Sequence, residues 1–350
     1  MGLRKFNNWI KTLLINQYCQ KGFNVFDICA GKGGDLTKWA HAKINRLFFA
    51  DIAEISVKDA VDRYTKDIST RPKLHAFLPT FICADCHKPG LQQELERQAI
   101  PFDLVSCQFA LHYSFESESS AKQFLTNVSC NLQPGGHFVA TLPSASRIVD
   151  RVTRSPSLNF GNPFYKVTFE KKEFPRFGAK YSFTLLDAVD SVPEYLVHHE
   201  TLVELAKACG LQFVEKQNFL EFYKKCKVPK NERLERTVRG ESGPLDPRFQ
   251  EIVGIYNIYV FKKVESVHLP AKNLLGLKKF PPVTEMDIIK IEEQPTTITP
   301  RPQRDTQTQN QHKEQQDQQE HKDQQDQQDQ QEHKEQADYK DQDDPHQDQD

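Results

Sequence analysis

Residues 24–35 read NVFDICAGKGGD, and this stretch decides the fold. Its first part, Asn24–Cys29, is a short apolar run that is typical of a buried strand. Its second part holds three glycines, which end the strand and turn the chain. The next residues, Leu36–Lys43, have the apolar spacing of a helix. A strand that turns through glycines into a helix predicts an open α/β sheet, in which ligands bind beyond the carboxyl ends of the strands.

The alternation of strand and helix continues along most of the chain. Further strands are predicted at Leu47–Asp51, Phe81–Asp85, Phe102–Phe109, His137–Thr141, Leu211–Phe219 and Ile252–Lys263, and helices at Val57–Tyr64, Ala121–Leu132 and Glu200–Cys209. Such alternation implies right-handed crossovers, so we expect an α/β fold with a mostly parallel, seven-stranded sheet. A turn is expected at 133–136. Residues 144–198 contain alternating, Phe- and Tyr-rich stretches such as YKVTFEKKEF, which predict an antiparallel insertion.

The formal net charge of −2 averages two unlike segments. Residues 304–350 hold five Lys or Arg against fifteen Asp or Glu, a net charge of −10, which leaves +8 for residues 1–303. The same segment has seventeen glutamines and almost no apolar residues, so burial cannot offset its chain entropy. We therefore predict a folded domain at 1–263, a Pro-containing linker at 264–303 and a disordered, low-complexity tail at 304–350.

The sequence shows no targeting or membrane segment. No apolar run approaches the roughly twenty residues that span a bilayer. The eight cysteines sit mostly inside apolar runs, which predicts free thiols in a reducing compartment. The cluster Cys83-Ala84-Asp85-Cys86-His87 has no second pair of ligands at a suitable distance. We therefore expect neither a metal nor a membrane as a partner.

Three carboxylates lie at the ends of successive predicted strands, namely Asp27, Asp51 and Asp85. Asp51 follows Asp27 by twenty-four residues, where an acid can chelate a ribose diol. The glycine turn lacks the Lys-Ser/Thr pair of a phosphate loop and has Leu36 where a dinucleotide fingerprint has Gly or Ala. A nucleoside cofactor without a pyrophosphate fits, and S-adenosylmethionine is the common one, with Asp85 in reach of its adenine. Each acid alone is explained as well by a loop carboxylate or a helix N-cap.

Polar and aromatic side chains crowd the end of the fourth predicted strand, where residues 106–116 read SCQFALHYSFE. This composition suits a flat heteroaromatic substrate, because an aromatic face stacks a base at about 1–3 kcal/mol and a carboxylate or histidine reads its edge.

The sequence resembles the mRNA cap guanine-N7 methyltransferases of eukaryotes, which are Rossmann-like class I enzymes that use S-adenosylmethionine. The resemblance spans roughly residues 3–263 and leaves out the tail. It is carried by FNNWIK (6–11), GKGGDLTKW (31–39), DIAEISVKDAVDRY (51–64), SCQFALHYSFES (106–117), VPEYLV (192–197) and NFLEFY (218–223). It implies methyl transfer to N7 of the guanine in the GpppN cap of nascent mRNA.

The resemblance also implies roles for individual residues. The cofactor positions fall on Lys11, Asp27, Cys29, Gly31, Asp51, Asp85, Gln108 and Tyr113. The cap positions fall on Asn7, Asn8, Lys32, Lys38, Arg63, His112, Glu116, Glu194 and Tyr256. One departure stands out, because Cys29 and Ala30 occupy the place where the family has a glycine that contacts the cofactor through its backbone.

The chemistry of the implied reaction asks little of side chains. Guanine N7 has a lone pair and no proton to lose, and a sulfonium is an excellent leaving group. Transfer is then an in-line displacement for which proximity and orientation can supply about 7–11 kcal/mol. We expect His112, Tyr113 and Glu194 to orient the base, with no residue acting as a general base. Glu194 suits the N1–H and N2–H donors of guanine, and Lys32, Lys38 and Arg63 suit the triphosphate.

Two other functions stay open on the sequence alone. One is a Rossmann methyltransferase that acts on another RNA or a small molecule, for which HYSFE and VPEYLV would be unexpected. The other is a cap-binding or scaffold protein whose cofactor site has decayed. Cys29 and Ala30 are the reason to consider it, because they replace the glycine that contacts the cofactor in the family. The resemblance further implies a monomeric catalytic unit in the nucleus that binds the capped 5′ end of mRNA. It leaves open whether the capping enzyme, RNA polymerase II or a small activating subunit also binds.

The acidic tail generates a first prediction. Deleting residues 304–350 should raise the affinity for capped RNA at low salt, because a segment of net charge −10 competes with RNA phosphates for the basic domain. Binding of labelled capped RNA by the full and shortened chains, measured along a salt series, tests this. Equal affinity at low salt would dispose of it.

Overall fold

The central sheet forms around β1 (Asn24–Ile28), which lies between two parallel neighbours, β2 (Arg46–Asp51) and β4 (Phe102–Gln108). Side chains alternate across the sheet, so that Val25 packs into the core on one face and Phe26 into the core on the other. A strand that is buried on both faces has few polar residues. This is why NVFDI is apolar apart from Asn24 at its start and Asp27.

The structure is a computed structural model that describes residues 2–71, 77–186, 189–226, 247–264 and 283–291. All of these belong to one unit of the chain, Met1–Glu293, and Gln294–Asp350 forms a second unit. The predicted tail at 304–350 and most of the predicted linker lie outside the described residues.

Among the described residues, eight strands form the central sheet in the order β10-β11-β5-β4-β1-β2-β3-β12. β11 is antiparallel to both of its neighbours, β10 and β5, and the other described pairings in this sheet are parallel. The remaining strands are β3 (Leu78–Cys83), β5 (Leu132–Pro143), β10 (Leu211–Asn218), β11 (Tyr256–Lys263) and β12 (Ile289–Lys290). The prediction of a Rossmann-like, mostly parallel sheet is confirmed, and seven of the eight strands are the predicted ones.

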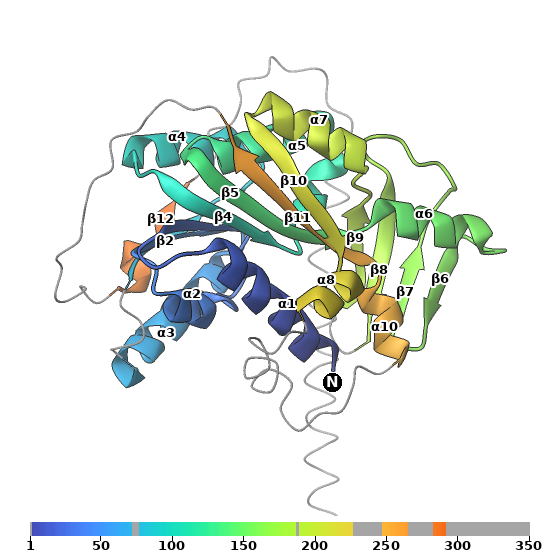
Figure 1. The fold of residues 1–350 in the computed structure, drawn as a ribbon, viewed down its shortest axis with the longest axis horizontal. Coiled ribbons are helices and arrows are strands. Elements are labelled where there is room, and N and C mark those ends of the chain that lie inside the picture. The colour runs from blue at the N-terminus through green and yellow to red at the C-terminus, as the bar shows by residue number, and fades with distance from the viewer. Residues whose placement is uncertain (1, 72–76, 187–188, 227–246, 265–282, 292–350) are drawn as a thin grey trace, which may run out of the picture. The chain divides into compact units, whose positions relative to one another are not determined.

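Helices cover both faces of this sheet (Figure 1). On one face lie α1 (Leu3–Tyr18), α2 (Leu36–Ala42) and α3 (Glu54–Thr70). On the other face lie α4 (Pro89–Gln98), α5 (Glu118–Ser129) and α7 (His199–Ala208). The sequence assigned no element to α1, although Phe6, Ile10 and Leu13 recur at helical spacing and are buried. Among the described helices, none is long and apolar enough to cross a bilayer.

The predicted insertion at 144–198 is present as a second, antiparallel sheet. It follows α6 (Ala145–Arg154) and consists of β6 (Asn159–Asn162), β7 (Tyr165–Thr168), β8 (Lys180–Leu185) and β9 (Val189–Tyr195). In its register Tyr181 lies opposite Glu194. Two short helices, α8 (Phe219–Cys226) and α10 (Pro247–Val253), complete this part of the fold, and Tyr223 of α8 packs its ring 5.3 Å from that of Phe6.

Three details differ from the predictions. The expected turn at 133–136 lies inside β5, where the register with β4 shifts and Gly135 takes a φ of 81°. The predicted strand Ile252–Lys263 begins only at Tyr256, because 252 and 253 end α10. The predicted linker is wrong for residues 283–291, which form a short turn, η3 (Glu285–Asp287), and the strand β12 at the edge of the sheet. Two paired residues are too short a run to show strand periodicity.

The buried carboxylate inside β1 generates a prediction. Burial, and then the charge of Asp35, raise the pKa of Asp27 above its ordinary value, so the folded state holds its proton more tightly than the unfolded chain. Ionising Asp27 should therefore cost stability as the pH rises above about 4. Asp27→Asn keeps an acceptor for the Trp39 indole N–H, which lies 2.9 Å from Asp27 Oδ2. We expect the variant to gain at least about 1 kcal/mol over wild type between acid and mildly alkaline pH. Denaturant unfolding across that range measures this, and parallel stability curves would contradict it.

Candidate functional site

Two glycines in the loop after β1 adopt positive φ angles, and they differ in what surrounds them. Gly33 takes a φ of 68°, and a Cβ placed there would lie 2.6 Å from Leu36 Cδ1, so the loop is pressed against α2. Gly31 takes a φ of 56°, and a Cβ there would meet nothing within 4 Å. The loop therefore packs tightly on its inner side and leaves backbone open at Gly31, where a ligand can approach.

Cys29 completes this loop in a conformation that usually belongs to glycine. Its φ is 56°, and its thiol turns to those of Cys107 and Cys86. The contact with Cys107 and burial raise the pKa of the Cys29 thiol well above its ordinary value. The side chain thus points into the sheet, and the backbone conformation expected of a glycine is kept. All eight cysteines are free thiols.

Asp51 at the end of β2 is held by the same loop. One carboxylate oxygen accepts the backbone N–H of Gly31 at 2.7 Å, and the other accepts that of Ala53 at 3.0 Å. Each oxygen keeps a further lone pair, so the carboxylate is fixed and can still accept hydroxyl donors. An open backbone at Gly31 beside such a carboxylate fits the ribose of S-adenosylmethionine.

Asp85 follows β3 by two residues and is also fixed. Its Oδ1 accepts the backbone N–H of His87 at 2.8 Å and lies 3.3 Å from His87 Nδ1. The His87 hydrogen bond holds the pKa of Asp85 below its ordinary value, against the effect of burial. Gln108, at the end of β4, is held between Ser106 and Thr141 at 3.1 Å each. The predicted cofactor residues of β2, β3 and β4 therefore lie at the same edge of the parallel part of the sheet, with β1 between β4 and β2.

Asp35 brings together three predicted site residues and was itself missed. Its carboxylate lies 2.8 Å from Lys11 Nζ and 2.7 Å from Lys38 Nζ. Lys38 Nζ also donates to Asn8 Oδ1 at 3.1 Å. Burial alone would raise the pKa of Asp35, but the two lysines outweigh it and the pKa lies below its ordinary value. The signal was available, because Asp35 ends the GKGGD motif, but no role was assigned to it.

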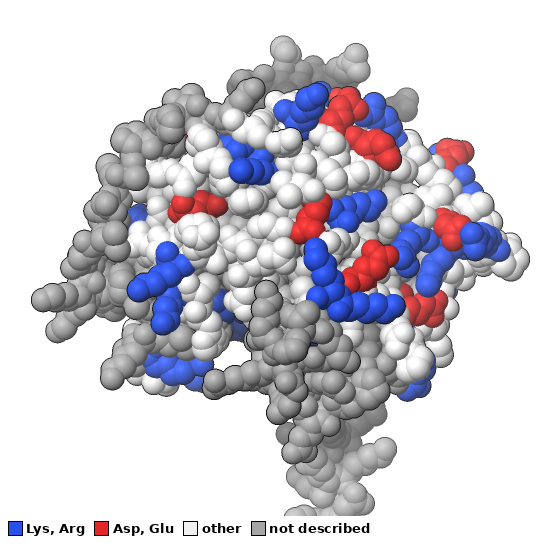
Figure 2. All heavy atoms as spheres, viewed as in Figure 1, with Lys and Arg blue, Asp and Glu red and all other residues white. Residues whose placement is uncertain are grey.

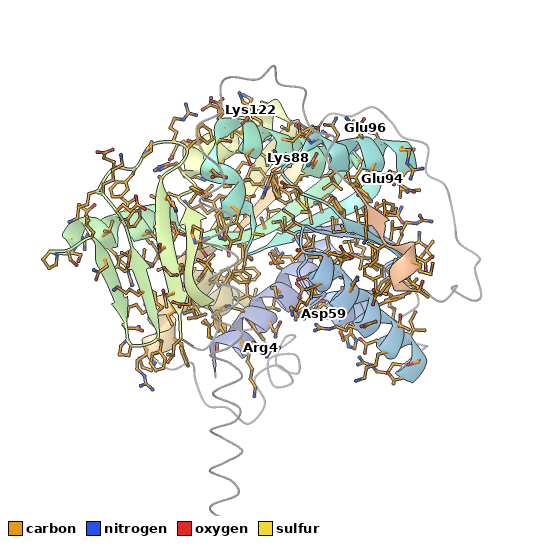
Figure 3. All side chains as sticks on the ribbon, turned by 180° about the vertical axis from the view of Figure 1, so that it is seen from behind. Arg4, Asp59, Lys88, Glu94, Glu96 and Lys122 are labelled. Carbon is orange, nitrogen blue, oxygen red and sulfur yellow. The ribbon has the colours of Figure 1, made fainter. Side chains whose placement is uncertain are left out.

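The other predicted phosphate-binding cations lie nearby on the same loop and α3. Lys32 Nζ is 3.0 Å from a carboxylate oxygen of Asp59, which Figure 3 labels on α3. Arg63 donates to the carbonyl of Gly33 at 3.3 Å. On the face shown in Figure 2, basic and acidic side chains are interspersed. Among the residues that the structure describes on that face, positive charge is therefore not gathered in one continuous patch.

A second group of predicted residues meets between the two sheets. His112, from the short helix η1 (Leu111–Glu116), and Glu194 of β9 are 1% and 6% exposed, and His112 Nε2 lies 3.4 Å from Glu194 Oε1. Neither ring nitrogen of His112 makes a hydrogen bond with a described residue. Tyr113 packs its ring 4.3 Å from that of His112, and burial followed by the charge of Glu194 raises the pKa of Tyr113 to about 12. The ring nitrogens of His112 thus lack the hydrogen bonds that buried polar atoms usually make.

Tyr181 was not predicted, and it holds the other oxygen of that carboxylate. Its hydroxyl donates to Glu194 Oε2 at 2.6 Å, and burial followed by the charge of Glu194 raises its pKa. Tyr256 lies on β11, the last of the predicted strands, and packs its ring 5.3 Å from that of Phe109. Glu116, at the end of η1, is exposed, and its Oε1 accepts the hydroxyl of Tyr195 at 3.0 Å.

Two more features lie beside or among the predicted site residues. Ile52 and Ile55 are 65% and 72% exposed directly after Asp51, which is unusual for large apolar side chains beside a polar site. Asn7 Oδ1 is buried without a hydrogen bond to a described residue. In the described part of the chain, no three His, Cys, Asp or Glu side chains are grouped to hold a metal ion.

The strained backbone at Cys29 generates a prediction. Cys29→Val should lower stability by about 1–3 kcal/mol, because a β-branched side chain is poorly tolerated at positive φ. Cys29→Gly should stay within about 1 kcal/mol of wild type, since relief of strain offsets the lost thiol packing. Thermal unfolding of the three proteins ranks them. A valine variant as stable as wild type would show that the left-handed conformation is not kept in solution.

Comparison with known proteins identifies the family to which this chain is similar. The mRNA (guanine-N(7))-methyltransferase domain matches residues 1–264. The mRNA cap guanine-N(7) methyltransferase 1 of Oryza sativa subsp. japonica is 40% identical over 276 residues, covering 75% of this chain and 74% of the rice protein. The Drosophila melanogaster mRNA cap guanine-N(7) methyltransferase is 40% identical over 239 residues, covering 63% of this chain and 56% of the fly protein. The chain thus spans between about half and three quarters of these relatives, and it belongs to the mRNA (guanine-N7)-methyltransferase family.

Proposed function

We propose that this protein methylates N7 of the guanine in the 5′ cap of mRNA, with S-adenosylmethionine as the methyl donor. The observation that carries the proposal is the buried carboxylate of Glu194, held by Tyr181 at 2.6 Å and facing His112 at 3.4 Å. A carboxylate offers about four lone-pair positions, and these two neighbours occupy two of them at most. The remaining capacity matches the two donors on the edge of guanine, N1–H and N2–H.

The chain's own residues then position the reactants. S-adenosylmethionine supplies a methyl group on a positively charged sulfur. Asp51 and Asp85 hold the nucleoside end of the cofactor. Gln108 ends β4, and Tyr113 lies on η1 beside His112 and Glu194. Lys32, Lys38 and Arg63 balance the charge of the cap triphosphate, and Asn7 and Asn8 offer amide groups beside Lys38.

No step requires a general base. N7 attacks with its own lone pair, so side chains contribute through distance and orientation. The guanine becomes cationic as the bond forms, and the Glu194 carboxylate stabilises that charge in a site with little water. His112 presents a ring nitrogen with no hydrogen bond to a described residue, which suits the O6 side of the base.

The proposal extends to the setting in which the protein acts. Its substrate is nascent mRNA, so we expect it in the nucleus, acting as a monomeric catalytic unit. The capping enzyme, RNA polymerase II and a small activating subunit are the partner classes that the family membership suggests. Copurification of the full chain with each of them tests this part separately.

The central experiment supplies labelled S-adenosylmethionine and GpppG-capped RNA. The proposal expects label in m7GpppG after digestion of the RNA to cap dinucleotides. Label in internal nucleotides or in a small molecule would favour a methyltransferase of another specificity. Failure to bind S-adenosylmethionine by calorimetry would favour a cap-binding protein without activity.

Glu194→Gln generates the prediction for the guanine site. A glutamine amide has one oxygen acceptor in place of two and carries no negative charge, so it binds the N–H donors of guanine less well and cannot stabilise the cationic product. We therefore expect kcat/KM for capped RNA to fall about 10- to 100-fold, which is a loss of about 1.4–2.7 kcal/mol in transition-state stabilisation. His112→Ala should lose activity by the same route. Affinity for S-adenosylmethionine should stay unchanged in both variants, and Glu118→Gln, on the exposed face of α5, serves as the matched control.

The pH dependence of the rate separates orientation from proton transfer. With no general base, kcat should be nearly flat across neutral pH for wild type and for both variants. A steep limb of the pH–rate profile that disappears in His112→Ala or Glu194→Gln would overturn this account.

A further inference from the structure

The edge of the sheet nearest the cofactor residues carries a strand that the family match does not include. The methyltransferase domain ends at residue 264, yet Ile289 and Lys290 of β12 pair in parallel with Ile82 and Cys83 of β3. The backbone N–H of Ile291 continues this pairing to the carbonyl of Cys83 at 3.0 Å. Figure 1 shows β12 in orange beside the blue part of the sheet. A segment from far along the chain therefore covers β3, which would otherwise be the edge strand.

Residues 283–291, here called the edge segment, are fixed at both ends to α3. Lys58 Nζ lies 3.2 Å from Glu285, and Lys290 Nζ lies 2.7 Å from Glu54. Thr65 donates its hydroxyl to the carbonyl of Val283 at 3.1 Å. Exposed ion pairs contribute little stability by themselves, so here they mainly fix the register of the segment.

Burial supplies the stronger attachment. Ile288 is 8% exposed and packs into the core under α1, α2 and α3, whereas Met286, two residues earlier, is 95% exposed. Ile291 reaches the other face of the sheet, where a Cβ added to Gly90 of α4 would lie 2.8 Å from its Cγ2 atom. The edge segment is therefore packed closely on both faces of the sheet, through Ile288 on one face and Ile291 on the other.

The contacts of the edge segment lie close in sequence to Asp51 and Asp85, the carboxylates proposed to hold the cofactor. Cys83 precedes Asp85 by two residues, and Glu54 follows Asp51 by three. The ends of β2 and β3 are tied together, since the N–H of Ala84 donates to the carbonyl of Asp51 at 3.0 Å. The edge segment therefore holds, from outside, the two strand ends whose carboxylates face the cofactor.

We infer that the edge segment is a positioning element for S-adenosylmethionine, with Ile288 and Ile291 as its positioning residues. This inference rests on the proposed function and on a cofactor site at Asp51 and Asp85. The segment touches no ligand and acts through β3 on Asp85 and through α3 on Asp51. The guanine-reading residues lie on η1, β9 and β11, which are separated from β12 by most of the sheet. Cofactor binding should therefore depend on the segment, and cap binding should not.

A matched pair of substitutions in the full chain tests this. Ile288→Asp places a charge in the core and should detach the segment, whereas Met286→Asp adds the same charge at an exposed site two residues away. We expect the dissociation constant for S-adenosylmethionine to rise about tenfold in Ile288→Asp and to change less than about twofold in Met286→Asp. Calorimetry measures the cofactor, and a fluorescence titration with GpppG should give equal cap affinity in both.

A second pair tests the fit without adding a charge. Gly90→Ala should weaken cofactor binding, because its Cβ would meet Ile291 Cγ2, although alanine favours a helix. Ile291→Ala removes that methyl group and weakens the segment's packing by itself. Adding Gly90→Ala to Ile291→Ala should then cost nothing more, which is the non-additivity expected of touching residues.

The outcomes separate the possibilities. Equal cofactor affinity in Ile288→Asp and Met286→Asp, or additive effects of the Gly90 and Ile291 changes, would overturn the inference. So would an equal loss of cofactor and cap binding in Ile288→Asp, because that marks general destabilisation. A wild-type chain that binds no S-adenosylmethionine would overturn the proposed function, and the inference with it.

Discussion

The carboxylate of Asp35 is the contact on which the arrangement of the site depends. It is nearly closed to solvent and balances two lysines, one from α1 and one from α2. Removing one partner of such a group leaves a buried charge, which is far more costly than any exposed pair. Through Lys11 this contact places the start of α1, with Asn7 and Asn8, against the glycine loop. The residues assigned to cap and to cofactor therefore share one electrostatic anchor.

Much of this architecture could be predicted because its signals are local. The apolar run of β1 and the glycines after it, and the acids that follow β2 and β3, are each visible within a few residues. The resemblance then assigned roles to side chains that the structure brings together, as with His112 and Glu194. The antiparallel insertion was also predicted, since alternation of apolar residues survives in β7 and β8.

What escaped prediction depends on contacts between distant segments. Tyr181 matters through its register opposite Glu194, and a strand reveals its register only when paired. Asp35 gains its role from Lys11, which is 24 residues away in the chain. β12 is two residues long and pairs with a strand about two hundred residues earlier, so no periodicity could show it. In each case the role of a residue depends on a contact with a distant segment, so the local sequence alone could not reveal it.

The left-handed conformation of Cys29 has a consequence for how such a site can vary. Its side chain turns toward the other thiols, and the loop leaves open backbone two residues later at Gly31. This position therefore constrains a torsion angle more than a particular side chain, and a residue that tolerates a positive φ can occupy it. A residue other than glycine here is not by itself a sign of a decayed site, because the conformation that glycine favours is present without glycine.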